Sequence, residues 1–290
     1  MMRFVLTSTL TMFFLLVAFA TCSAEKAVPP PHRIISLMPS LTELVFALGF
    51  GKRVVGVSDY CNYPPEVASI PRVGGMELNL ERIVGLQPDL IIDLDEAHAR
   101  YANTLRGLGI PMQNYKERRL DEIASTAVAI SRDFGESASG EAFANSWSLG
   151  MASATGCDIV SKNACRVYIE VWDSPLQAAG RETFIDDILK AAGGVNIIET
   201  GKTTFPLLDA ETVINGNPDL ILLAYPSKDP GAVARRTGWE NLHAVRNGGI
   251  RVIDPDIFTR PGPRCLKAIR ELKRLLATCP THEDIASSTP

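Results

Sequence analysis

Two segments of the chain share one pattern of apolar and polar positions. Residues 79–93 (NLERIVGLQPDLIID) and residues 209–223 (DAETVINGNPDLILL) align without gaps, 130 positions apart. Each begins with a polar residue suited to a helix N-cap, continues through a short helix, breaks at Pro88 or Pro218 and enters an apolar run. A short continuous apolar run is typical of a strand buried in a parallel sheet. The pattern therefore predicts a duplicated helix–strand unit.

A second pair of matching helices precedes this unit in each half of the chain. Ser40 with Glu43, and Thr183 with Asp186, have the spacing of a capping box, in which the hydroxyl and the carboxylate each accept a hydrogen bond from an unpaired N–H group at the helix start. Each helix lies between two predicted strands and is expected to end at a glycine, which tolerates a left-handed conformation. The strands are 33–37 and 54–57 in the first half and 166–171 and 196–198 in the second, and the glycines are Gly49 and Gly193.

Strands that alternate with helices in this way predict parallel sheets covered by helices on both faces. We therefore expect an α/β fold with two Rossmann-like lobes, residues 25–117 and 166–290. Residues 118–165 contain no proline and predict a helical connector, with helices near 120–134 and 137–154. Such a connector restrains movement of the lobes more than a Gly/Ser linker would. A single duplicated α/β domain without a cleft is the alternative.

The first 24 residues have the features of an export signal. Arg3 precedes a mostly apolar stretch, 4–20, and residues 22–24 (CSA) are the small residues that a signal peptidase accepts. We expect cleavage after residue 24 and a periplasmic protein. Lipid attachment at Cys22 is the less favoured alternative, because Thr21 stands where a smaller residue is usual. No later segment approaches the roughly 18 unbroken apolar residues of a transmembrane helix, so the mature protein is expected to be soluble.

Export makes disulfide bonds possible among the cysteines that remain after cleavage, which are Cys61, Cys157, Cys165, Cys265 and Cys279. An odd number leaves at least one thiol free or bonded to another chain. Cys157 and Cys165 enclose a short polar segment and are candidates for a local disulfide. Cys265 and Cys279 stand at the two ends of one predicted helix, about 21 Å apart at about 1.5 Å per residue, which excludes a bond between them.

Composition agrees with an ordinary globular protein. The chain has 290 residues, of which 46% are hydrophobic and 21% are charged, and its formal net charge is −4. It is too apolar for a disordered chain and long enough for two domains. A slightly acidic chain is unlike a nucleic-acid-binding protein, which usually carries a basic stripe. We therefore expect no nucleic-acid partner. We also expect a monomer.

The sequence lacks the common catalytic motifs. It has no GxSxG, no HExxH and no GxGxxG after a strand, and residues 201–203 (GKT) lack the earlier glycine of a phosphate-binding loop. The four histidines are scattered, so no metal site is predicted. His98, beside Asp95 and Glu96, is expected at a solvated helix start, with axial ligation of a metal cofactor as the alternative. We therefore predict a binding protein without an intrinsic cofactor rather than an enzyme.

Aromatic and polar residues follow several of the predicted strands. Ligands of open α/β sheets bind at the carboxyl ends of the strands, where such loops gather. The loops are 38–40, 58–60 and 63–65 in the first half, and 172–175, 204–206 and 256–264 in the second. Apolar rings with a few charged neighbours suit a large, flat, partly polar ligand. We therefore expect a ligand cleft between the two lobes.

Four segments together resemble a known family. RIISLMPSLTELVFALG (33–49), VVGVSDYCNYPPE (54–66), NLERIVGLQPDLII (79–92) and RPGPR (260–264) are similar to segments of periplasmic vitamin B12-binding proteins. These are substrate-binding components of ABC importers, in a helical-backbone class that also contains iron–siderophore and haem receptors. The resemblance covers nearly all of residues 33–278. It implies two α/β lobes bridged by one long helix, and delivery of cobalamin or a related corrinoid to a membrane permease.

The resemblance also implies roles for individual residues. In this class a surface glutamate on each lobe docks onto arginines of the permease dimer, and the matching positions are Glu81 and Glu211. Each also lies near a predicted helix N-terminus, where the helix dipole alone favours a carboxylate. The family pattern sets rings against the corrin and a charged pair against its amide side chains. The matching residues are Tyr60, Trp172, Phe205, Asp256, Phe258 and Arg260.

Two departures from the family bear on the ligand. Gly74-Gly75-Met76 and Leu94 stand where the best-known members have tryptophans. A cleft with fewer rings would suit a different corrinoid, such as cobinamide, or a smaller chelate. One alternative is a haem or ferric-siderophore receptor of the same fold, in which Tyr60 or His98 could ligate the metal. Another is an α/β enzyme of the nitrogenase-like or chelatase type, whose cofactor cysteines are missing at equivalent positions in the two halves.

Overall fold

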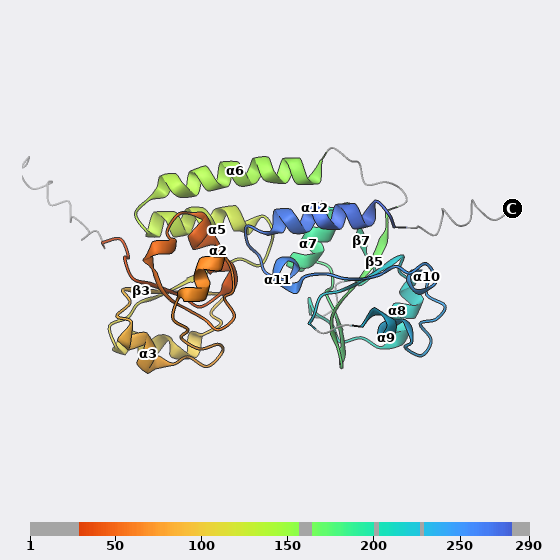
Figure 1. The fold of residues 1–290 in the computed structure, drawn as a ribbon, viewed down its shortest axis with the longest axis horizontal. Coiled ribbons are helices and arrows are strands. Elements are labelled where there is room, and N and C mark those ends of the chain that lie inside the picture. The colour runs from red at the N-terminus through yellow and green to blue at the C-terminus, as the bar shows by residue number, and fades with distance from the viewer. Residues whose placement is uncertain (1–28, 157–163, 200–202, 227–228, 280–290) are drawn as a thin grey trace, which may run out of the picture. The chain divides into compact units, whose positions relative to one another are not determined.

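The computed structural model describes residues 29–156, 164–199, 203–226 and 229–279, whose elements are drawn in Figure 1. The described residues from 31 onward belong to one compact unit. The predicted export signal, residues 1–24, lies outside the described residues. Among the described helices, none combines the length and the apolar character that crossing a membrane requires.

The first lobe is built on a four-stranded parallel sheet in the order β2–β1–β3–β4. Its strands are β1 (Ile34–Ser36), β2 (Val54–Val57), β3 (Leu90–Leu94) and β4 (Met112–Tyr115). Its α-helices are α2 (Pro39–Ala47), α3 (Leu80–Gly85) and α4 (Ala102–Gly107), and its 3-10 helices are Gly51–Arg53, Pro65–Ser69 and Ala99–Tyr101. The predicted strand–helix alternation is therefore present in this lobe.

The second lobe repeats this topology. β5 pairs in parallel with β7 and β8, and β8 pairs with β9, so the order β7–β5–β8–β9 matches the order in the first lobe. A short strand, β6, adds an antiparallel pairing to the end of β5, where the sequence predicts only a loop. The strands are β5 (Arg166–Asp173), β6 (Leu176–Ala178), β7 (Val195–Asn196), β8 (Leu220–Leu223) and β9 (Ile250–Val252). The helices are α7 (Phe184–Ala191), α8 (Ala210–Gly216), α9 (Pro230–Ala234), α10 (His243–Arg246), α11 (Pro255–Phe258) and α12 (Cys265–Leu276).

The duplicated Pro-Asp sequence has a structural role in both lobes. The Asp89 carboxylate accepts hydrogen bonds from the N–H groups of His32 (2.7 Å) and Arg33 (3.0 Å). The Asp219 carboxylate accepts one from the N–H group of Arg166 (2.9 Å). In each lobe this aspartate joins the start of one buried strand, β3 or β8, to the start of its neighbour, β1 or β5. The repeat thus aligns two adjacent strands.

The helix caps follow the sequence at three of the four predicted positions. Asn79 and Asp209 each accept a hydrogen bond from the N–H group three residues later, at 2.9 Å and 2.8 Å. The Thr183 hydroxyl likewise accepts from the N–H group of Asp186 at 3.2 Å. The Asp186 carboxylate, however, accepts from the N–H group of Glu182 rather than from that of Thr183. The predicted glycine ends are confirmed as well, since Gly49 and Gly193 have φ of 86° and 93°.

The capping box predicted at Ser40 is wrong. Helix α2 begins at Pro39, and its N-cap, Met38, makes no side-chain capping bond. The Glu43 carboxylate turns instead to Arg264 of the second lobe, with N–O distances of 2.8 Å and 2.6 Å. A strong charged partner outside the helix therefore replaces the local bond that the spacing indicates.

The connector helices, α5 (Glu122–Asp133) and α6 (Ser137–Thr155), lie within two residues of the predicted ends. Helix α6 packs along α5 and along α12, as Figure 1 shows. Gly140 permits the close approach to α5, because a Cβ atom there would lie 2.8 Å from the Cα atom of Val128. One apolar core runs from the first lobe through α5 and α6 into α7 and α12. The two helices therefore share a packed interior with both lobes.

A disulfide joins Cys165, just before β5, to Cys279, just after α12. The local pairing predicted for Cys157 and Cys165 is therefore wrong, and Cys157 lies outside the described residues. The predicted lack of a bond between Cys265 and Cys279 is confirmed, because α12 is continuous and Cys265 is a buried free thiol, as is Cys61. The bonded cysteines are 114 positions apart in sequence, so only the tertiary fold, in which α12 packs on α6 and α7, brings them together.

Candidate functional site

In the first lobe, Tyr60 projects from the loop after β2 and is 52% exposed. Its ring covers Gly75, where a Cβ atom would lie 2.9 Å from the tyrosine oxygen and 3.0 Å from the ring. Gly75 thus leaves the space that this ring occupies. Any larger residue at this position would collide with the Tyr60 ring.

His98 supports the loop that contains Gly75. Its Nδ1 lies 2.9 Å from Asp93 Oδ1, its N–H group donates to Asp93 Oδ2 at 2.8 Å, and its Nε2 lies 3.1 Å from the carbonyl oxygen of Gly75. Both side chains are buried. The hydrogen bond with Asp93 is the main cause that raises the pKa of His98, and burial opposes it. The expected solvated position is therefore wrong, and neither ring nitrogen is free to ligate a metal.

In the second lobe, Trp172 at the end of β5 is 49% exposed and Phe205 is 44% exposed. The Trp172 ring packs against the ring of Tyr225, with centroids 6.3 Å apart. Gln177 donates to the carbonyl oxygen of Phe205 at 3.1 Å and so holds the backbone at Phe205 in place. Tyr225 follows the buried strand β8, and the general rule that ligands gather at strand ends could have identified it.

A buried ion pair contacts Tyr225, the ring that packs against Trp172. The fully buried carboxylate of Glu170 in β5 accepts two hydrogen bonds from Arg236, at 2.6 Å and 2.9 Å, and a third from the Tyr225 hydroxyl. The Arg236 guanidinium also lies over the ring of Trp239, 4.7 Å from its centroid. Tyr225, which packs against the exposed ring of Trp172, therefore belongs to a satisfied charged network.

Asp256 and Arg260, predicted to reach polar groups of a ligand, form an ion pair at 2.6 Å. Asn62 of the first lobe bonds to both, donating to Asp256 at 2.6 Å and accepting from Arg260 at 2.7 Å. The prediction for Phe258 does not match the structure, because its ring is fully buried in the core and presents no surface to a ligand. The apolar side of helix α11 packs inward there, which a four-residue helix does not reveal by its period.

A second contact between the lobes lies beside this network. The Arg264 guanidinium that pairs with Glu43 also lies over the ring of Tyr63, 4.4 Å from its centroid. Burial raises the pKa of Glu43, although Arg264 opposes this shift. These residues line a cavity of about 400 Å³. The segment 260–264 thus contacts the first lobe through two separate charged groups.

Glu81 and Glu211 occupy the same place in their helices, α3 and α8. Each follows the N-capping residue by two positions, lies in the first turn and is exposed. The structure thus presents both carboxylates to solvent on equivalent elements of the two lobes. No ring contact joins Tyr60, Trp172 and Phe205 within the described residues, so these rings stand apart as separate exposed groups.

Metal-ligating side chains gather at one place among the described residues, where atoms of Cys165, Asp219 and Cys279 lie within 4.8 Å of one another. Both sulfur atoms belong to the disulfide and so are not thiolate ligands. This cluster lies outside the loops that carry the exposed rings.

Comparison with known proteins places this geometry in context. Residues 34–257 match the model of a family described as periplasmic binding protein. An uncharacterized ABC transporter substrate-binding lipoprotein, YvrC of Bacillus subtilis, is 31% identical over 253 residues, which cover 83% of this chain and 79% of that protein.

Two solved structures share the fold. The periplasmic vitamin B12-binding protein BtuF of Vibrio cholerae is 28% identical with a TM-score of 0.72, and the match covers 90% of this chain and 100% of that one. The periplasmic haem-binding protein RhuT of Roseiflexus is also 28% identical, with a TM-score of 0.73, and the match covers 84% of this chain and 97% of that one. The two-lobe α/β architecture is therefore shared with proteins whose named ligands differ.

Proposed function

The chain belongs to the periplasmic binding protein family, a family of substrate-binding transport proteins of the ABC importer type, and we propose that it captures cobalamin or a related corrinoid. The observation that carries this proposal is the set of exposed rings in both lobes, namely Tyr60 after β2, Trp172 at the end of β5, and Phe205. A corrin ring is large and flat, and exposed aromatic rings provide the apolar contact area that it needs. The nearby network of Asn62, Asp256 and Arg260 offers donors and acceptors for its amide side chains.

A haem ligand is the second candidate. The exposed side chain of Tyr60 favours it, since a tyrosine oxygen is a known axial ligand of haem iron. His98 does not contribute to this alternative, because both of its ring nitrogens already have partners. A ferric siderophore has weaker support, because Arg260 and Arg264 are already paired with Asp256 and Glu43.

Calorimetric titration of the ligand-free protein with cyanocobalamin, cobinamide and haemin tests the two candidates. We expect one corrinoid per chain with sub-micromolar affinity, and at least about a tenfold loss in Trp172→Ala, because truncating a buried aromatic contact typically costs more than about 1.4 kcal/mol. Leu149→Ala, a change of an exposed residue on α6, is the matched control and should bind as the wild type does. Tight binding of haemin alone, lost in Tyr60→Phe, would replace corrinoid by haem.

We further propose that Glu81 and Glu211 dock onto a permease dimer. Their equivalent positions on α3 and α8 support this, since two carboxylates related by the repeat suit a two-fold partner. The double variant Glu81→Ala with Glu211→Ala should abolish uptake by cells while leaving ligand affinity unchanged in calorimetry. Glu66→Ala removes another exposed carboxylate and serves as the control. Normal uptake by the double variant would contradict this role.

We also propose that residues 1–24 export the protein and that it works outside the cytoplasm. The lipoprotein name of the Bacillus relative keeps attachment at Cys22 as an alternative. Mass spectrometry of the exported protein distinguishes a chain that begins at residue 25 from one that begins with a lipid-modified Cys22.

A further inference from the structure

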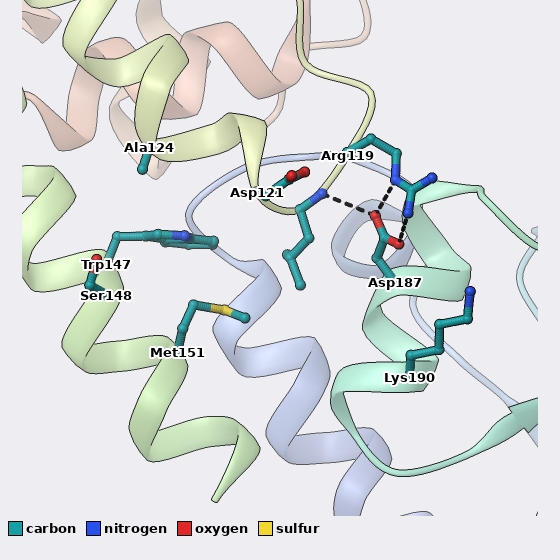
Figure 2. A pocket seen from close by; sticks show the side chains of 9 residues that line it. Arg119, Asp121, Ala124, Trp147, Ser148, Met151, Asp187 and Lys190 are labelled. Atoms are coloured by element: carbon teal, nitrogen blue, oxygen red, sulfur yellow. Dashed lines mark hydrogen bonds and ion pairs between the residues drawn. The ribbon is translucent and has the colours of Figure 1, made fainter.

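A cavity of about 490 Å³ lies away from the exposed rings, where the start of α5 meets α6 and α7 (Figure 2). None of the residues proposed to contact the corrinoid lines it. Its volume is within the range of small-molecule sites, about 300–1,000 Å³. It is walled by the connector helices and by α7 of the second lobe, so an occupant would touch both parts of the molecule.

The floor of the cavity is apolar and includes an aromatic ring. Trp147 and Met151 stand one turn apart on α6, and Figure 2 shows both side chains extending from this helix into the cavity, with Ala124 above them. The Trp147 ring is only 6% exposed and stacks on Phe143, with centroids 6.1 Å apart and planes 14° apart. This packing holds the indole in place, so the floor is preformed.

The cations at the rim are already neutralised. Arg119 donates to both oxygens of Asp187, at 2.8 Å and 2.6 Å, and the N–H group of Leu120 donates to the same carboxylate. Lys190 pairs with Asp186 at 2.6 Å. The hydrogen bond to Asp187 is the main cause that raises the pKa of Arg119. These two cations are therefore not available to an anionic ligand.

Asp121 is the exception at the rim. It precedes α5 without capping it, and no hydrogen bond or ion pair of its carboxylate is found among the described residues. The lining thus has two cations, Arg119 and Lys190, and two carboxylates, Asp187 and Asp121. Asp187 and the fully buried Asp186 neutralise the cations, and Asp121 acts on Arg119 only at longer range, so its carboxylate is the uncommitted one of the lining. The cavity therefore combines an apolar, aromatic floor with one negative charge at its edge.

We propose that this cavity is a second binding site, for a small organic cation with a flat apolar body. The body would lie on Trp147 and Met151, and its ammonium group would face the Asp121 carboxylate. An aromatic face and a carboxylate both favour a positive charge, and both favour it more where water is partly excluded. This site is independent of the proposed corrinoid site and stands whether or not that proposal holds.

Three probes of one shape test the proposal on the ligand-free protein, namely 1-naphthylmethylammonium, 1-naphthylmethanol and 1-naphthylacetate. In calorimetry we expect saturable binding of one ammonium probe per chain, at least tenfold tighter than the carboxylate, with the alcohol between them. Asp121→Asn should remove the preference for the cation. Glu141→Gln, which removes an exposed carboxylate on α6 outside the cavity, should preserve it.

A blocking variant tests the location of the probe. Ser148 lies on the rim and is exposed, so Ser148→Trp should fold normally and abolish binding of all three probes. Trp172→Ala should leave probe binding unchanged, which distinguishes this site from the proposed corrinoid site. Absence of saturable binding, a cation preference that survives Asp121→Asn, or binding that is lost in Trp172→Ala would each overturn the proposal.

Discussion

The two lobes support their exposed rings on different buried charges. In the first lobe Tyr60 rests on Gly75, whose carbonyl oxygen contacts His98, and His98 pairs with Asp93 in β3. In the second lobe Trp172 rests on Tyr225, whose hydroxyl donates to Glu170 in β5, and Glu170 pairs with Arg236. Both carboxylates are fully buried in strands.

The two buried networks differ in the cation that pairs with the carboxylate, which is His98 in the first lobe and Arg236 in the second. An arginine stays charged at any ordinary pH, whereas a histidine loses its charge near neutrality. The network that supports Trp172 in the second lobe should therefore be insensitive to pH. The network that supports Tyr60 in the first lobe should change with pH. Two lobes of the same topology can thus support exposed rings on networks that differ in their sensitivity to pH.

The largest expected effect is on the arginine network. Arg236→Met should lower the free energy of unfolding by about 3 kcal/mol, because it leaves the buried Glu170 carboxylate without its cation. Urea denaturation measures this change. Arg235→Met is the matched control, since that neighbouring side chain is 74% exposed, pairs with the exposed Asp229 and should change stability by less than about 1 kcal/mol. Equal effects of the two variants would show that the network does not stabilise the lobe.

A smaller, pH-dependent effect is expected in the first lobe. The pKa of His98 is raised in the folded protein, so its contribution is fully present below about pH 6.5 and is lost as the pH rises through the folded value. His98→Gln should cost about 1–2 kcal/mol at pH 5.5 and less at pH 8. Urea denaturation at both values measures it. An equal loss at both pH values would contradict a charged His98, and Arg236→Met should give that flat result.

The smallest expected effect comes from displacing the Tyr60 ring and is measured as a loss of ligand affinity. Gly75→Ala adds a Cβ atom against Tyr60 and should weaken corrinoid binding roughly fivefold, about 1 kcal/mol, by displacing the ring. Gly85→Ala is the control, because nothing lies within 4 Å of the atom it adds. Calorimetry compares the two variants. Unchanged affinity in Gly75→Ala would mean that the position of the Tyr60 ring does not matter for the ligand.

Local patterns identified the elements because local forces form them. The apolar runs of β3 and β8, the caps at Asn79 and Asp209, and the glycine ends of α2 and α7 all depend on residues a few positions apart. The duplicated order of these elements then restricted the topology to parallel sheets. The permease role of Glu81 and Glu211 remains a prediction, since only their exposure and equivalent positions are visible.

The errors arose where a distant residue competes with a local one. Glu43 has the spacing of a capping residue but pairs with Arg264, 221 positions away. Cys165 bonds Cys279 rather than a near neighbour. Phe258 follows a strand, as a ligand residue would, yet packs into the core. No local pattern distinguishes these outcomes, because the deciding partner is set by how the lobes and α12 pack.

The sequence by itself determined the repeat, the α/β class, the helical connector and the loops that carry the exposed rings, since spacing and hydrophobic period encode all of these. The tertiary structure alone decided which charges are buried and with whom. It revealed His98 as a buried support, Asn62 as a bridge between lobes and the cavity beside Trp147. Burial and pairing depend on elements far apart in the chain, and they decide which polar groups are left free to bind a ligand.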